Sequence, residues 1–264
     1  MEVTRQGITK GLHRLGVSRG DVVEVHSSLS RFGTVAGGAE AVVDVLLAAV
    51  GPGGTVVMSA YPVSRGLDVT DRDRARGVTW KVRVLPEGSK ERTAMGAVVE
   101  EFCGRPGVIV GEGIHRVAAW GRHAERHVMR GYQELVDADG LALLLGVGID
   151  RCSSLHLADS VPLPRPLDAY FRIPDEVRQA YPPDVCIGYH EPPETPWAKA
   201  KEEIDKQGLI RKGRIGQADC MLFRVRPMLA AIESILKRDP FAAFGLTDLK
   251  RVSEDGDAHV RAKR

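Results

Sequence analysis

The chain has 264 residues, of which 43% are hydrophobic, 27% charged and 5% aromatic, and its 37 Lys and Arg against 35 Asp and Glu give a net charge of +2. This length and apolar content allow a sizeable buried core and exclude a disordered or collagen-like chain. A charge so close to zero gives no electrostatic support for nucleic-acid binding. The longest apolar run, residues 141–149, is about half a membrane span, so we expect no membrane-spanning helix.

Two further features concern the cellular compartment. The first residues, MEVTRQ, include an acid and no apolar segment, which argues against a signal peptide. The cysteines are far apart and form no CxxC pair: Cys103, Cys152, Cys186 and Cys220. This spacing favours free thiols in a reducing cytoplasm over a disulfide framework or a metal site. We therefore expect a cytoplasmic protein that binds neither a membrane nor a metal.

The beginning of the chain alternates helix and strand patterns. Residues 4–15 predict a helix that Gly16 ends, and residues 21–26 (DVVEVH) predict a strand. Residues 38–50 have apolar side chains at helical spacing, and residues 55–58 predict a second strand after a Gly- and Pro-rich break. This order points to an α/β fold with a largely parallel sheet.

Residues 61–92 differ in character, since they contain eight Lys or Arg and five Asp or Glu. One interpretation is a solvated excursion from the core. The other is a loop over a site whose arginines meet an anion, such as the phosphates of a ligand.

The remaining elements are expected from the same patterns. Helices are predicted over residues 93–102, from after residue 116 to about 129, from Ser153 or Ser154 to 159, and over 196–208 and 227–238; strands over 108–110 and 141–147; and irregular or short-strand structure over 161–196. We predict one domain over residues 1–250, followed by a polar tail over 251–264.

The first candidate site follows the first predicted strand. His26, Ser27 and Ser28 stand at the end of that strand, and Gly37 and Gly38 precede the next helix. In open α/β sheets ligands bind beyond the carboxyl ends of strands, where hydroxyls and backbone N–H groups suit a phosphate or an amide. The alternative, that Ser28 caps a turn and His26 packs in the core, stays open.

The second candidate site is the sequence SSLHLAD, residues 153–159. On a helix, His156 and Asp159 are i,i+3 neighbours on one face. The carboxylate could fix the imidazole tautomer and stabilise the imidazolium, as in a general base with its orienting partner. Spacing alone leaves a surface ion pair as the alternative.

A third group of histidines follows residue 110. His115 lies in a glycine-rich loop with Glu112, where a ligand could reach it. His123 and His127 are four residues apart, but the residues between them do not complete HExxH. A solvent-facing helix stripe is therefore the favoured interpretation of that pair.

Motifs of two other enzyme classes do not occur. The sequence has no GxxxxGK[ST] loop and no GxGxxG fingerprint, which disfavours P-loop and dinucleotide-binding chemistry. A Cys152 nucleophile is formally possible because His156 is near in sequence, but no separate histidine is evident to activate it.

The order of these motifs resembles the aminoglycoside 3-N-acetyltransferase family, which is distinct from the GNAT acetyltransferases. The resemblance rests on VHSSLSRFG, VGPGGTVVM, LLLGVG and SSLHLAD, and on the final segment from IGQA to DPF, and it covers roughly residues 4–245. It implies a single α/β domain of the antibiotic N-acetyltransferase type, with a central mixed, largely parallel sheet flanked by helices.

The resemblance also implies a reaction: acetyl transfer from acetyl-CoA, without a metal, to the 3-amino group of the deoxystreptamine ring of an aminoglycoside antibiotic, which gives resistance. His156 matches the catalytic histidine of the family and would take a proton from the attacking amine, and Asp159 stands where the family has glutamate. The resemblance assigns the path of CoA to five residues: His26, Ser27, Ser28, Gly37 and Gly38.

The expected substrate site departs from the family pattern. The loop around His115 keeps the histidine but lacks the arginine, serine and proline that accompany it in the family. Because aminoglycosides are polycations, their site needs acceptor groups, and we expect Glu112 and Asp184 to join His115 there. Three alternatives stay open: a same-fold acetyltransferase for another amine, a CoA- or aminosugar-binding protein without turnover, and a hydrolase that uses Cys152 or a serine. A homo-oligomer is also possible.

Overall fold

The structure is a computed structural model that describes residues 2–250. The strands are β1 (Val22–Ser27), β2 (Thr55–Ser59), β3 (Val78–Arg83), β4 (Ile109–Val110), β5 (Val117–Gly121), β6 (Leu141–Leu145), β7 (Val185–Tyr189), β8 (Ile210–Ile215) and β9 (Ala218–Arg224). The α-helices are α1 (Arg5–Leu15), α2 (Gly38–Val50), α3 (Asp71–Ala75), α4 (Ala97–Cys103), α5 (Ala124–Arg130), α6 (Tyr132–Asp137), α7 (Arg165–Phe171), α8 (Asp175–Arg178), α9 (Pro196–Lys206), α10 (Val225–Arg238) and α11 (Pro240–Ala243). The 3₁₀-helical segments are η1 (Leu29–Phe32), η2 (Ile149–Arg151) and η3 (Ser153–Ser160).

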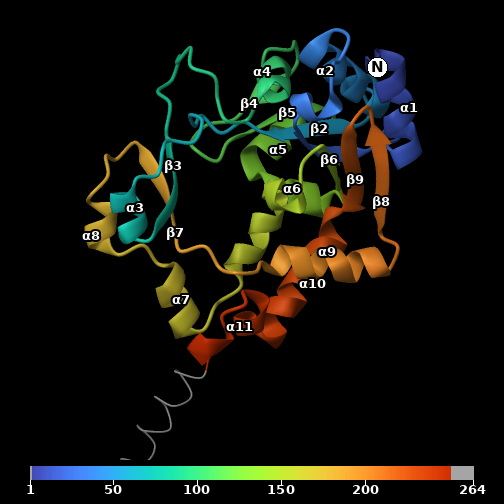
Figure 1. The fold of residues 1–264 in the computed structure, drawn as a ribbon. Helices are drawn as coiled ribbons and strands as arrows, with labels where there is room; N and C mark the ends of the chain where they lie inside the picture. Colours follow the sequence, from blue (N-terminus) through green and yellow to red (C-terminus); the bar gives the residue numbers. More distant parts are fainter. Residues whose placement is uncertain (1, 251–264) are drawn as a thin grey trace, which may run out of the picture.

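The main sheet is mixed and has the strand order β4-β5-β2-β1-β6-β9-β8 (Figure 1). β1 is parallel to both of its neighbours, with Val23 opposite Val56 of β2 and Leu141 of β6. The outer pairings are antiparallel. The predicted α/β domain with a mixed sheet is confirmed, but parallel pairing is confined to its centre, because short connections such as the turn between β8 and β9 impose antiparallel pairing.

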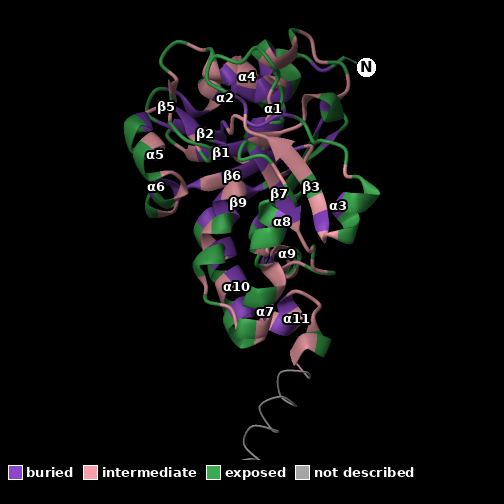
Figure 2. Cartoon of the chain, turned by 90° about the vertical axis from the view of Figure 1, so that its left-hand side faces the viewer, coloured by how far each residue is buried: buried purple, intermediate pink, exposed green. Residues whose placement is uncertain are grey.

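Hydrophobic side chains cover both faces of this sheet. On one face, Val23 and Val25 of β1 pack with α1, α2 and α4. On the other face, Ala142 and Leu144 of β6 pack with η3, α9 and α10. The sheet is therefore the middle of three layers, and its central strands are mostly buried (Figure 2). By strand alternation, Glu24 belongs to the second face.

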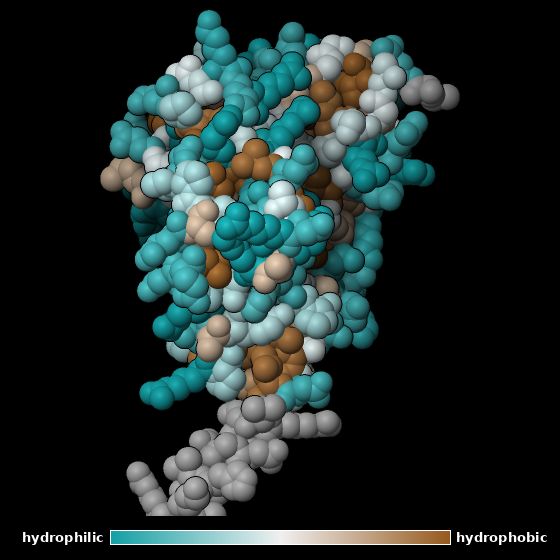
Figure 3. All heavy atoms as spheres, turned by 60° about the vertical axis from the view of Figure 1, so that its left-hand side comes forward, coloured by the Kyte–Doolittle hydropathy of each residue, from teal (hydrophilic) through white to brown (hydrophobic). Residues whose placement is uncertain are grey.

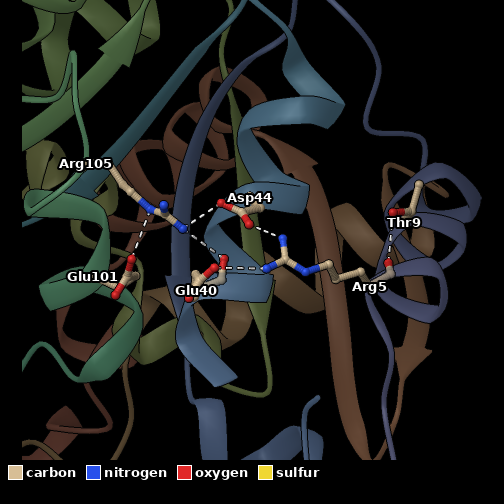
Figure 4. A network of polar contacts seen from close by, with 6 residues as sticks. All are labelled: Arg5, Thr9, Glu40, Asp44, Glu101 and Arg105. Carbon is tan, nitrogen blue, oxygen red and sulfur yellow. Dashed lines mark hydrogen bonds and ion pairs between the residues drawn. The ribbon is translucent and has the colours of Figure 1, made fainter. Parts of the chain in front are cut away.

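An ion-pair network joins the helices of the first face (Figure 4). Asp44 of α2 accepts hydrogen bonds from Arg5 of α1 and, at 2.6 Å, from Arg105 after α4. Arg5 also contacts Glu40 at 3.2 Å, and Arg105 contacts Glu101 at 3.0 Å. These side chains are partly exposed, so solvent screening keeps the contribution of each pair to stability small. The network mainly fixes how the three helices lie against one another.

The strands β3 and β7 form a separate antiparallel ribbon beside the main sheet (Figure 1). Its polar centre is the buried Asp73 of α3, which accepts hydrogen bonds from Lys81 Nζ at 2.7 Å and from the Tyr181 hydroxyl at 2.5 Å. These two hydrogen bonds, with further ones from Thr70, hold the pKa of the Asp73 carboxyl far below its ordinary value. An ionised carboxylate therefore ties α3 to the ribbon.

The region that was predicted as one helix, from after residue 116 to about 129, forms a strand and then a helix. Residues 117–121 form β5, which pairs antiparallel with β2, and α5 begins only at Ala124. Gly121 explains the break, because its φ is +99° and a Cβ there would lie 2.2 Å from the carbonyl oxygen of Gly54. The apolar residues before it therefore extend along β2 instead of continuing into the helix.

Other expected elements differ in kind or were missed. Residues 153–160 form a 3₁₀-helix without a side-chain cap, where we predicted a helix capped by Ser153 or Ser154. Residues 61–92 contain α3 and β3, and residues 161–196 contain α7, α8 and β7. The hairpin β8–β9 was not predicted. The predicted tail, residues 251–264, lies outside the described residues.

The surface agrees with the composition. The face that carries the β3–β7 ribbon is mostly hydrophilic, with small separate hydrophobic patches (Figure 3). Among the described helices, none has the length and apolarity to cross a bilayer. The four cysteines are free thiols, as predicted.

Candidate active site

A cavity of about 850 Å³ opens where β1, β2 and β6 end. Its floor contains residues 25–28 from the end of β1, together with Ser59 and Val147 from the ends of the neighbouring strands. Residues 92–100, at the start of α4, form another wall, and Ser153 and His156 of η3 complete the lining. The volume is that of a typical small-molecule site. The first and second predicted sites therefore share one cavity.

His156 carries an oriented imidazole at this cavity. Its Nδ1 lies 2.8 Å from Asp159 Oδ2, and its ring stands edge-on to Trp197 of α9, with centroids 4.7 Å apart. The residues i and i+3 of a 3₁₀-helix eclipse each other, which brings the two side chains together. The carboxylate fixes Nδ1 as the protonated nitrogen, so Nε2 can accept a proton from a ligand.

A buried polar cluster lies below the cavity. The Glu24 carboxylate is fully buried, with Oε1 2.7 Å from His26 Nε2 and 3.0 Å from the Ser154 amide nitrogen, which donates to it. Cys152 Sγ donates to the other oxygen at 3.6 Å. Burial alone would raise the pKa of Glu24, but the charge of His26 and the hydrogen bonds from His26 and Ser154 outweigh it and lower that pKa.

Glu24, His26 and Cys152 also form the group of possible metal ligands found among residues 2–250, because their donor atoms lie within 4.8 Å of one another. The carboxylate already accepts hydrogen bonds from its neighbours. Burial, and then the charge of Glu24, raise the pKa of Cys152 well above its ordinary value. Zinc binds a thiolate, and this environment favours the thiol. We therefore interpret Glu24, His26 and Cys152 as a hydrogen-bonded cluster.

A chain of hydroxyl groups ends at the cavity wall. Ser59 Oγ donates to Ser153 Oγ at 2.9 Å and lies 2.6 Å from the Tyr132 hydroxyl. Because Ser59 has one proton and gives it to Ser153, Tyr132 must donate to Ser59. Burial, and then the charge of Glu24, keep the pKa of Tyr132 well above its ordinary value. The proton of Ser153 is thereby left for a ligand.

Of the residues expected to bind CoA or to act in catalysis, five line the cavity and two adjoin it. His26, Ser27, Ser28, Gly38 and His156 line the cavity. Gly37, just before α2, and Asp159, bonded to His156, adjoin this lining.

The expected substrate residues lie farther out. His115 contacts the ring of Tyr61, which lines the cavity, with centroids 5.5 Å apart. Glu112 is exposed on its loop. Asp184 lies directly before β7, and its carbonyl oxygen accepts a hydrogen bond from Val84 N. Neither acid lines the cavity. Their expected role stays a prediction.

Sequence reasoning missed several contributors to the site. Glu24 precedes His26 by two residues, so strand alternation could have placed both on one face. Arg65 and Arg92, from the charged stretch with two open interpretations, both line the cavity. That position supports the interpretation in which its arginines meet an anion.

A family model described as aminoglycoside 3-N-acetyltransferase matches residues 25–237 of this chain. The protein belongs to the aminoglycoside 3-N-acetyltransferase family. Membership makes the chain an enzyme of the acetyltransferase class, as predicted.

Several members of the aminoglycoside 3-N-acetyltransferase family resemble the chain over most of its length. Aminoglycoside N(3)-acetyltransferase IV of a Salmonella species is 29% identical over 245 residues, which is 87% of this chain and 85% of the relative. The prophage-derived aminoglycoside N(3')-acetyltransferase-like protein YokD of Bacillus subtilis is 28% identical over 244 residues, 83% of this chain and 87% of the relative. A crystal structure of a histidine-to-alanine mutant of aminoglycoside acetyltransferase AAC(3)-IVa, in complex with a gentamicin, has a TM-score of 0.70 and 25% identity and covers 92% of both chains.

Proposed function

We propose that this enzyme transfers the acetyl group of acetyl-CoA to the 3-amino group of the deoxystreptamine ring of an aminoglycoside. The observation that carries the proposal is the 2.8 Å contact between His156 Nδ1 and Asp159 at a cavity formed by the ends of the central strands. Family membership supports the reaction class. Acetyl-CoA as the donor is consistent with the expected location in the cytoplasm.

The cavity suits acetyl-CoA as the donor substrate. Ser27 and Ser28 offer hydroxyls, and Gly38 lets a ligand approach the start of α2. Arg65 and Arg92 supply positive charge for phosphates. The Ser153 hydroxyl, whose proton is free, would donate to the thioester carbonyl oxygen as negative charge develops there.

In this mechanism His156 acts as the general base. An amine near pH 7 is mostly ammonium, and only its neutral form attacks a carbonyl carbon. His156 Nε2 takes the proton of the amine as the N–C bond forms, and Asp159 stabilises the resulting imidazolium. Direct attack is favoured over a covalent acetyl-enzyme, because the buried Cys152 is held as a thiol.

One observation favours a second candidate, acetylation of a different amine by the same chemistry. The acids that line the cavity are already engaged: Glu100 accepts from Thr93 N at 3.0 Å, and Asp150 pairs with Arg151 at 3.0 Å. A polycationic aminoglycoside needs acceptor groups. An amine with fewer positive charges needs fewer of them and would fit this lining as well.

The test is thiol release from acetyl-CoA with a panel of aminoglycosides, with and without a free 3-amino group. Release confined to 3-amino substrates would support the proposal. Release only with other amines would favour the second candidate. Absence of release with every amine, together with CoA-dependent protection from melting, would leave a binding protein without turnover and contradict both.

A further inference from the structure

Two imidazoles, rather than one, are oriented by carboxylates at this cavity. Two groups contact His26 Nε2, Glu24 Oε1 at 2.7 Å and the Ser153 amide nitrogen at 3.2 Å. A protonated Nε2 suits the carboxylate, and an unprotonated one suits the N–H group. The carboxylate is nearer and charged, and charge-assisted hydrogen bonds are stronger than neutral ones. We therefore assign the Nε2 proton to the bond with Glu24.

This assignment leaves Nδ1 as the nitrogen of His26 that can serve a ligand. No hydrogen bond to this atom is found among residues 2–250, and the ring lines the cavity. When His26 is protonated, Nδ1 carries a proton as well, and the imidazolium balances the negative charge of Glu24. In that state Nδ1 is a proton donor at the cavity wall, and the contact between Nε2 and Glu24 holds the ring in place.

Both imidazoles line the same cavity. Ser153, the first residue of η3, contacts His26 through its backbone nitrogen, and His156 follows three residues later in the same 3₁₀-helical segment. One ligand in this cavity can therefore meet both rings.

We propose that His26 is the general acid of the acetyl transfer and that Glu24 is its positioning residue. The inference rests on the proposed function and deepens it. As the amine nitrogen bonds to the thioester carbon, its proton goes to His156. As the C–S bond breaks, the sulfur takes the proton of His26 Nδ1, so that neutral CoA thiol leaves. Solvent then returns a proton to His26 and removes one from His156.

Two further titratable groups lie near the pair of Glu24 and His26. Cys152, before η3, and Tyr132 of α6 both have pKa values raised well above their ordinary ones by burial. The strand neighbour of His26 on β6 is the apolar Leu144. The further charged groups of the cavity are His156, Arg65, Arg92, Glu100, Asp150 and Arg151.

The experiment is the pH dependence of kcat with acetyl-CoA, for wild type, His26→Gln and the matched control His13→Gln on the exposed face of α1. A bell-shaped wild-type profile is expected, since base and acid must be in opposite protonation states. His26→Gln should lower kcat by about 10² to 10⁴-fold and abolish the alkaline limb. His13→Gln should match wild type. A raised KM for acetyl-CoA with unchanged kcat would make His26 a binding residue only and overturn the proposal.

Glu24→Gln tests the positioning role, because the amide keeps the shape and removes the charge. A smaller loss of kcat is expected, with the alkaline limb moved to lower pH, since the imidazolium loses its counter-charge. A uniform loss of kcat without movement of the limb would indicate a structural role and contradict this part. If the variant does not fold, the His26→Gln profile still decides the general acid.

Further outcomes distinguish a failure of the general-acid role from a metal site and from a failure of the proposed function. Activity lost on chelation and restored by zinc would assign Glu24, His26 and Cys152 to a metal and overturn the proposal; under the proposal a chelator has no effect. If wild type releases no CoA with any amine, the proposed function itself fails. If wild type turns over and His26→Gln retains both limbs, only the general acid is wrong.

Discussion

The Tyr181 hydroxyl donates to the Asp73 carboxylate at 2.5 Å, across 108 residues of sequence. This contact joins α3 to the segment before β7, and Lys81 of β3 contacts the same carboxylate. The small ribbon therefore depends on one buried anion.

Asp73→Asn should destabilise the ribbon. The loss of charge-assisted hydrogen bonds costs about 1.5–3 kcal/mol each, so we expect faster hydrogen exchange in β3 and β7. The folded pKa is depressed, so the carboxylate contributes stability above its ordinary pKa of about 4, and that contribution is lost as pH falls below it. The variant should therefore lose less stability on acidification than wild type. Asp71→Asn, at an exposed position, is the control, and equal exchange in both variants would contradict the prediction.

His156→Ala should abolish proton removal from the amine while sparing the donor site. We expect kcat to fall by about two to four decades, with CoA affinity retained in calorimetry. Thiol release under saturating substrates measures the first quantity. Intact turnover would mean that another group is the base.

Asp159→Asn should have a milder effect than loss of the imidazole. The amide can still contact Nδ1 but no longer balances the imidazolium charge, so the acid limb of the kcat profile should move to lower pH. The alkaline limb should stay in place. An unchanged acid limb would remove Asp159 from the mechanism.

Cys152→Ala should be nearly silent in turnover. Burial and the neighbouring Glu24 raise the pKa of the thiol, so it supplies no thiolate near neutral pH and should resist alkylation by iodoacetamide in the folded enzyme. Peptide mass mapping after labelling checks the second point. Abolished activity would instead favour the thiol route.

Gly121→Ala should destabilise the fold strongly. Its φ is +99°, and the added Cβ would meet the Gly54 carbonyl oxygen at 2.2 Å. The strained φ alone costs about 1 kcal/mol, before β2 and β5 are forced apart. Gly53→Ala is the matched control, since a Cβ there has no neighbour within 4 Å. Equal melting temperatures of the two variants would refute this account.

Much of the framework follows from local patterns. Gly16 ends α1 in the left-handed conformation, and α2 and the core strand β6 lie where apolar spacing predicts them. The sequence Val-Ala-Ala-Trp of β5 has no local pattern that predicts a strand. Its strand state depends on pairing with β2, about 60 residues earlier, and sequence patterns do not carry such tertiary pairing.

The candidate site was predictable where residues adjacent in sequence share a function. His156 and Asp159 are three residues apart and make the predicted contact. Glu24 and Cys152 are 128 residues apart and meet only because β1 lies beside the segment that follows β6. Glu112 and Asp184 were expected from their charge and from the family pattern, and neither of these specifies where the side chains point.

The central position of β1 has a consequence for synthesis on the ribosome. β1 is among the first strands to emerge, yet its second neighbour β6 begins only at Leu141, and the strand that covers β6 ends at Arg224. Non-local pairing of this kind slows folding. The nascent chain therefore exposes an apolar strand with a free edge until most of its length has been translated, and chaperone supply during expression should govern how much active protein is recovered.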